Sequence, residues 1–92
     1  MRQILRECEK LVYWYGLSEA RQRVVVNMMF NLGPNRFNAF KKMNAAIEAG
    51  EFQVAADEMI DSKWYRQVGN RAERLEQAMR WNDERYLGEG LV

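Results

Sequence analysis

The sequence has 92 residues, which is enough for one small domain with a single hydrophobic core but not for two lobes with a cleft between them. Hydrophobic residues make up 48% of it, and it contains a single proline, so we expect residues 1–92 to form one folded domain rather than a disordered chain. The formal net charge of +1 excludes a general electrostatic attraction to nucleic acids or to anionic membranes.

The sequence contains no histidine and one cysteine, Cys8. A histidine triad, a histidine general base, a histidine-ligated metal site and a disulfide within the chain are therefore excluded. No phosphate-binding loop, metal-spaced cluster or nucleophile elbow is present, so we expect neither a cofactor nor a metal. No apolar stretch reaches the roughly 20 residues of a membrane span, and the N-terminus lacks the apolar segment of a signal peptide. We expect the chain to be made in the cytoplasm.

The first two predicted elements are helices. Apolar residues between positions 4 and 15 recur at intervals of three and four, which predicts an amphipathic helix that ends near Gly16. The next segment, 18–32, begins with Ser18 as an N-cap, becomes apolar on every face and stops at Gly33-Pro34. We expect it to be the buried central helix.

Three valines in a row, at positions 24–26, would also suit a buried strand, but no second strand-like segment exists to pair with it. Three further helices are predicted, over residues 36–49, 52–62 and 70–81. A short connector, 63–69, and a tail that frays from Asn82 complete the chain. The prediction is one all-α domain of about five helices around a buried central helix.

Carboxylates are the remaining candidates for acid–base chemistry. Hydrolysis of a glycosidic bond by the usual route needs two of them flanking the sugar, one kept protonated by apolar surroundings. Glu7 and Glu9 lie on the polar side of the first helix, and three more acids lie beside the apolar stripe of the fourth helix: Asp57, Glu58 and Asp61. We interpret all five as solvated helix faces. A catalytic use of the last three in a novel arrangement is an alternative.

Four other side chains are candidates for structural or binding roles. Asn27 is the one polar residue in the middle of the central helix, and we expect it to bond to backbone in the core. Asn31, one turn further on and next to the end of the helix, either bonds to backbone or faces a cleft. Trp64 and Tyr65 are interpreted as core anchors, with stacking on a sugar as the alternative.

A helix-turn-helix is a further alternative for the middle of the chain, with Arg36, Lys41 and Lys42 contacting phosphates. The near-neutral charge and the inward phenylalanines of the third helix argue against it. We therefore expect no nucleic-acid partner.

Two separated motifs resemble a known family, the phage-type lysozymes. They are NMMFNLG at 27–33 and DSKWYRQVGNRAERL at 61–75. In this family of peptidoglycan muramidases, similar segments belong to the C-terminal helical lobe, and the resemblance covers roughly residues 14–81. It implies the fold of that lobe and an association with murein, the polymer of amino sugars cross-linked by peptides. The family's catalytic Glu, Asp and Thr lie in an N-terminal lobe that has no counterpart in this sequence, so hydrolysis by this chain alone is not expected.

The resemblance also implies roles for individual residues. Phe30 and Asn31 match cleft-facing positions, Gly33 matches the turn that lets substrate approach, and Arg71 matches an arginine that pairs with the catalytic glutamate. Trp64 matches a core tryptophan of the lobe. The implied substrate-binding set is Phe30, Asn31, Gly33, Tyr65 and Arg71, and Glu58 lies near a position where some relatives use an amide to touch substrate.

Two functional hypotheses follow. The first is a lobe that supports murein binding and is complemented by a catalytic N-terminal lobe, with a homodimer possible through the first helix and Phe30. The second is a non-catalytic module, derived from the lysozyme fold, that binds murein or a protein. In either case the site of action would be the cell wall of a phage host or bacterium, reached through other export factors.

Overall fold

The computed structural model describes residues 2–87, and every regular element in this range is a helix. The prediction of an all-α fold is confirmed, although the described residues form seven α-helices rather than about five. These are α1 (Arg2–Glu9), α2 (Glu19–Leu32), α3 (Pro34–Ala39), α4 (Lys41–Glu48), α5 (Phe52–Ile60), α6 (Lys63–Val68) and α7 (Asn70–Trp81). Two 3-10 helices, η1 (Trp14–Gly16) and η2 (Glu84–Tyr86), complete the set.

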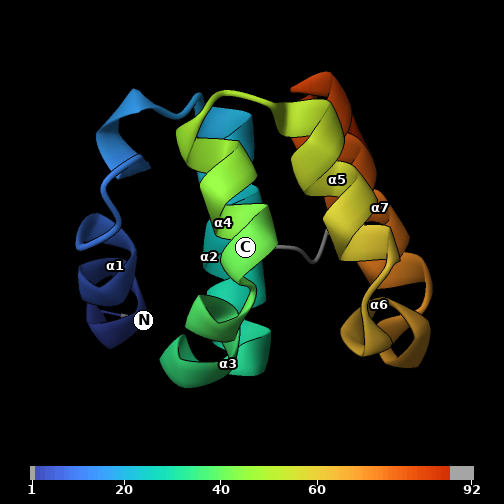
Figure 1. Cartoon of the computed structure of the whole chain (residues 1–92), viewed down its shortest axis with the longest axis horizontal. Helices are drawn as coiled ribbons and strands as arrows, with labels where there is room; N and C mark the ends of the chain where they lie inside the picture. The colour runs from blue at the N-terminus through green and yellow to red at the C-terminus, as the bar shows by residue number, and fades with distance from the viewer. Residues whose placement is uncertain (1, 88–92) are drawn as a thin grey trace.

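The central helix is α2, as the sequence predicts. Ser18 caps it, because the Ser18 hydroxyl oxygen accepts a hydrogen bond from the Arg21 backbone N–H at 3.3 Å. Every residue from Val24 to Met29 is buried. The helix packs against α1, α3 and α7, and in Figure 1 α1 and α7 lie on opposite sides of it. Neighbours on several sides explain why its sequence is apolar on every face.

The expected helix over residues 36–49 is wrong in detail, because the structure breaks it into α3 and α4. The predicted end of the central helix before Gly33-Pro34 is confirmed, because α2 ends at Leu32 with Gly33 as its C-cap. Pro34 then opens α3, at a position where its missing N–H costs nothing. The break falls at Phe40, whose ψ of 67° is not helical, and the Asn44 amide donates to the carbonyls of Phe37 (3.1 Å) and Phe40 (2.9 Å). The side chain thus adds a second hydrogen bond to two carbonyls that also accept backbone N–H groups, from Phe40 (3.1 Å) and Asn44 (3.0 Å).

The connector and the tail are also more ordered than expected. Six residues of the connector form α6. After α7 the chain turns at Asn82, which has a φ of 54°, and Leu87 packs into the core with 1% of its surface exposed. The expectation that the tail frays from Asn82 is therefore wrong for residues 82–87, and the part of it that concerns 88–92 lies outside the described residues.

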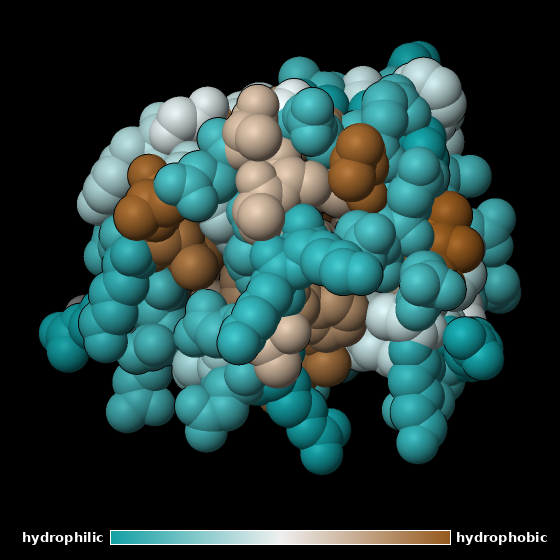
Figure 2. Space-filling view, viewed as in Figure 1, coloured by the Kyte–Doolittle hydropathy of each residue, from teal (hydrophilic) through white to brown (hydrophobic). Residues whose placement is uncertain are grey.

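The surface is mostly polar, with separate apolar groups on the face shown in Figure 2. Leu5 on α1 and Phe30 on α2 are exposed, at 41% and 57%, as the dimer hypothesis requires, and the dimer itself stays a prediction. No helix within residues 2–87 is long and apolar enough to cross a lipid bilayer.

Candidate functional site

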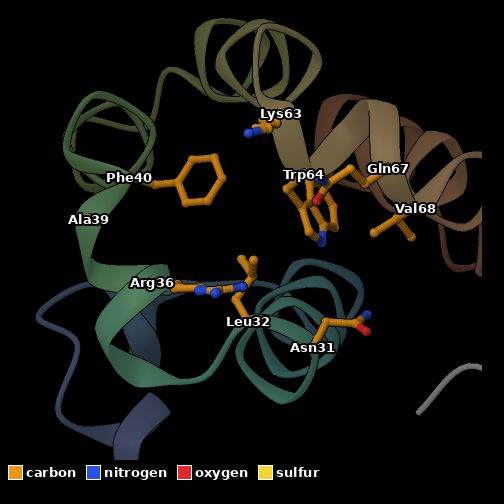
Figure 3. A pocket seen from close by; sticks show the side chains of 9 residues that line it. All are labelled: Asn31, Leu32, Arg36, Ala39, Phe40, Lys63, Trp64, Gln67 and Val68. Atoms are coloured by element: carbon orange, nitrogen blue, oxygen red, sulfur yellow. The ribbon is translucent and has the colours of Figure 1, made fainter.

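A pocket of about 460 Å³ lies between the end of α2, the helix α3 and the helix α6 (Figure 3). This volume is within the usual range for small-molecule sites. Nine side chains from these three segments line it: Asn31, Leu32, Arg36, Ala39, Phe40, Lys63, Trp64, Gln67 and Val68.

One wall of the pocket depends on the turn between α2 and α3. Gly33 has a φ of +81°, a conformation that other residues rarely adopt, and its N–H donates to the Met29 carbonyl at 2.8 Å. The turn directs α3 away from the end of α2, so that Asn31 and Arg36 both reach the pocket. The role of Gly33 as a turn residue agrees with the prediction, and its role in substrate approach stays a prediction.

The opposite wall is α6, which is held at its start by Ser62. The Ser62 oxygen accepts a hydrogen bond from the Tyr65 N–H at 3.1 Å, and its hydroxyl donates to the Met59 carbonyl at 2.6 Å. Trp64 is 7% exposed, and its ring meets Phe40 edge-on with centroids 6.5 Å apart. The interpretation of Trp64 as a core residue is confirmed.

Trp64 nevertheless carries an unusual polar atom. Its indole Nε1 is buried and has no hydrogen-bond partner among residues 2–87. In Figure 3 the nitrogen-bearing edge of the ring is turned toward Leu32 and Arg36. A buried donor without an acceptor costs about 1–3 kcal/mol, so an acceptor from outside these residues would be favourable here.

Of the five predicted substrate contacts, Asn31 lines this pocket. Phe30, on the adjacent position of α2, is 57% exposed. Tyr65 is half-buried on a different side of α6, where burial and the carboxylates of Glu76 and Glu73 raise the pKa of its hydroxyl. Arg71 is partly buried in the first turn of α7, and its Nε is buried without a partner in the described part of the chain.

Three polar residues of the pocket are not among the predicted substrate contacts. The sequence suggests Arg36 only as a phosphate contact in the helix-turn-helix alternative, and it suggests no role for Lys63 or Gln67. Lys63 and Gln67 lie in the second family motif, close to Trp64 and Tyr65, and this position in the motif is the signal that could have identified them. No comparable signal marked Arg36, because its approach to α6 is a tertiary contact.

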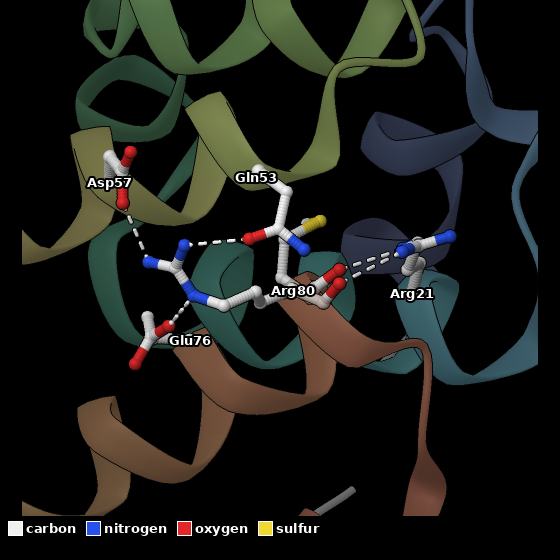
Figure 4. A network of polar contacts seen from close by, with 6 residues as sticks. Arg21, Gln53, Asp57, Glu76 and Arg80 are labelled. Carbon is white, nitrogen blue, oxygen red and sulfur yellow. Dashed lines mark hydrogen bonds and ion pairs between the residues drawn. The ribbon is translucent and has the colours of Figure 1, made fainter.

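The carboxylates do not form a pair of the glycosidase kind in residues 2–87. Glu76 is the one buried acid there, at 5% exposed, and it is paired with Arg80 at 2.7 Å. The same guanidinium donates to Asp57 at 2.7 Å and to Gln53 at 2.9 Å (Figure 4). Hydrogen bonds to Asp57 and Glu76 raise the Arg80 pKa, so this cluster is a stable ion network that joins α5 to α7.

A second arginine strengthens the same region. Arg21 on α2 donates to the backbone carbonyls of Met79 (2.7 Å) and Arg80 (3.3 Å) near the end of α7, and its guanidinium lies 3.6 Å from the centroid of the Phe52 ring. Cations near the C-terminus of a helix stabilise it. Asp57 is therefore part of a structural network, while Glu58 is half-buried and Asp61 is exposed. No group of acids or Cys8 within the described residues could hold a metal ion.

Comparison with known proteins gives two similar chains. The probable T4-type lysozyme 1 of Dictyostelium discoideum is 36% identical over 60 residues, which are 65% of this chain and 35% of that protein. The pre-baseplate central spike protein Gp5 of Enterobacteria phage T4 is 34% identical over 62 residues, which are 67% of this chain and 11% of that protein. These two matches support a lysozyme-like relationship for the chain.

This lysozyme-related chain spans about a third or less of the length of these two curated relatives. No family model matches it, and no solved structure matches it. The resemblance recognised from the two motifs is thus confirmed at the level of a lysozyme-like relationship.

Proposed function

We propose that this chain is the C-terminal helical lobe of a T4-type lysozyme, which supports the binding of peptidoglycan and depends on the catalytic residues of a second lobe for hydrolysis. The second lobe would be supplied by the same polypeptide or by another chain. The similarity to a T4-type lysozyme and the two family motifs support this assignment.

The observation that carries the proposal is the buried, unpartnered Nε of Arg71. It matches the family arginine that pairs with the catalytic glutamate across the cleft, and here its Nε is buried with no partner within residues 2–87. A buried guanidinium N–H without an acceptor is unfavourable, and a carboxylate gives it a strong, charge-assisted hydrogen bond. A glutamate from the second lobe would supply that acceptor.

The ion pairs of the carboxylates in this chain also support a catalytic role for the second lobe rather than for this one. The buried acid Glu76 is bound to Arg80, and Asp57 shares that arginine, so both are engaged in an ion network that joins α5 to α7. The pocket beside Asn31 would hold part of the substrate while the second lobe acts on the glycosidic bond.

The test is clearing of a suspension of purified murein, followed by turbidity. The chain is assayed alone, and again after mixing with the N-terminal lobe of a phage-type lysozyme. We expect no clearing alone, clearing on mixing, and at least about a tenfold loss of that clearing in Arg71→Ala, because a charge-assisted hydrogen bond is removed. Arg74→Ala, an exposed arginine on the same helix, is the matched control and should keep full clearing.

Three results would overturn the proposal. Clearing by the chain alone would mean that its own acids act catalytically, with Asp57, Glu58 and Asp61 the first to replace. An equal loss of clearing in Arg71→Ala and in Arg74→Ala would show that Arg71 has no specific role. Murein that is pulled down by the chain but not cleared on mixing would favour the second candidate, a non-catalytic murein-binding module.

A further inference from the structure

A groove of about 390 Å³ lies between α4 and the residues that follow α1. Nine residues line it: Lys10, Leu11, Val12, Tyr13, Asn38, Lys41, Asn44, Ala45 and Glu48. None of them lines the pocket beside Asn31. The groove is therefore a separate surface, and the proposed function assigns no role to it.

One stripe of α4 forms a wall of this groove. Lys41, Ala45 and Glu48 are spaced by four and three residues, so they lie on the same side of the helix. All three are exposed, and neither Lys41 nor Glu48 takes part in an ion pair within residues 2–87. The stripe thus has a positive end and a negative end, about 10 Å apart along the helix axis, with a small side chain between them.

The charges of α4 are placed against its dipole. The first turn contains Lys41 and Lys42 and no acid, and the helix ends at Glu48 with no base in its last turn. A helix N-terminus favours negative charge and a C-terminus favours positive charge. An antiparallel second copy of α4 would bring its Glu48 to this N-terminus and its Lys41 to this C-terminus, so the partner would supply both favourable charges.

Apolar surface lies beside the charged stripe. Val12 lines the groove and is 80% exposed. It also lines an adjoining hollow of about 340 Å³ whose other walls include Leu17, Ile47 and Phe52, and Glu48 lines both spaces. Covering such apolar surface is favourable in proportion to the area removed from water. A second copy would bring its own Val12 to this surface, and both side chains would be covered together.

We propose that two copies of this chain associate through this face, with their α4 helices antiparallel about a twofold axis near Ala45. Lys41 of each copy then faces Glu48 of the other, so the same pair of charges is used twice. The small Ala45 side chain lets the two helices approach at the axis. Contacts of Val12 supply most of the affinity, because exposed ion pairs contribute little, whereas the ion pairs fix the orientation. This interface goes beyond the proposed function, and it differs from a dimer through α1 and Phe30.

The test is sedimentation equilibrium of the chain at protein concentrations up to about 1 mM. Lys41→Glu and Glu48→Lys should each raise the dissociation constant of the dimer at least about tenfold, because like charges then face each other twice. The double variant with both changes restores opposite charges and should return the constant to within about threefold of the parent chain. Added salt should weaken the parent dimer, because it screens exposed charges.

The matched control is Lys42→Glu, the same change of charge at an exposed position of α4 that does not line the groove. It should dimerise like the parent chain. A chain that stays monomeric up to about 1 mM, equal weakening in Lys42→Glu and Lys41→Glu, or no recovery in the double variant would each overturn the proposal. A dimer that is lost in Phe30→Ser and unchanged in Lys41→Glu would overturn it in favour of the face formed by α1 and Phe30.

Discussion

Burial of ionisable groups is clearest at Cys8, in the last turn of α1, and at Tyr13, just before η1. Cys8 is fully buried, and burial, with smaller effects of Glu7 and Glu9, raises the pKa of its thiol to about 11. Burial also raises the pKa of the Tyr13 hydroxyl, which donates a hydrogen bond to the Asn44 side-chain oxygen. Both groups are held neutral by the folded state.

A raised pKa in the folded chain makes stability depend on alkaline pH. Below about pH 9 the Cys8 thiol is neutral in both states, and between about pH 9 and pH 11 the unfolded chain loses the proton first. We expect the free energy of unfolding to fall by about 1–2 kcal/mol through this range from Cys8 alone. Urea unfolding at about pH 8 and about pH 10.5 measures it.

Cys8→Ala should lose part of this pH dependence, although it lowers stability at every pH because it leaves a cavity. Tyr13 and Tyr65, whose pKa values are raised in the same direction, contribute to the remainder. An equally steep fall in the variant and in the parent chain would contradict the role of Cys8.

At the junction of α3 and α4, one amide side chain joins three segments of the chain. Asn44 bonds the carbonyls of Phe37 and Phe40 with its nitrogen, and its oxygen accepts from the Tyr13 hydroxyl. All three partners are outside α4, so this side chain joins α3, α4 and the segment after α1. Because both the nitrogen and the oxygen of this partly buried amide form hydrogen bonds, the stability of the junction should be sensitive to removal of the Asn44 side chain.

Asn44→Ala should therefore lower the free energy of unfolding by about 1–3 kcal/mol, because it removes three hydrogen bonds and leaves the partly buried Tyr13 hydroxyl without its acceptor. Urea unfolding followed by circular dichroism gives the value. Asn38→Ala, in an exposed position of α3, is the control and should change stability by less than about 0.5 kcal/mol. A loss of the same size in both variants would show that the junction does not depend on the Asn44 amide.

The same junction marks the limit of prediction from the sequence. The boundaries of α2 follow from local signals, Ser18 at its start and Gly33 after its end, and these were predictable. The break at Phe40 was not, because it depends on bonds from Asn44 and on contacts distant in sequence. The same distinction explains why only part of the pocket was predictable. Asn31 is marked by its place at the end of a helix, whereas Arg36 comes near α6 only in the folded chain.

At the scale of the whole molecule, the end of the described chain closes the core. Leu87 follows η2 and is 1% exposed, and it belongs to the same buried cluster as residues of α1, α2, α5 and α7. One cluster that includes residues from both ends of the described range predicts a single cooperative unfolding transition.

Leu87→Ala should lower the free energy of unfolding by about 2–4 kcal/mol while the transition stays cooperative, because a fully buried leucine leaves a cavity. Val54→Ala, on the exposed side of α5, should cost less than about 1 kcal/mol. Thermal unfolding of the two variants beside the parent chain distinguishes these values. A Leu87→Ala protein as stable as the parent chain would mean that residues 82–87 do not contribute to the core.

The three tryptophans lie in different surroundings, with Trp14 and Trp64 buried and Trp81 57% exposed. Fluorescence from an indole depends on its contact with water, so the three side chains emit differently. Replacing Trp14 and Trp81 with phenylalanine would leave Trp64 as the one emitter, and its spectrum would then report on the pocket alone. The chain thus contains an optical probe at its candidate site that requires no attached dye.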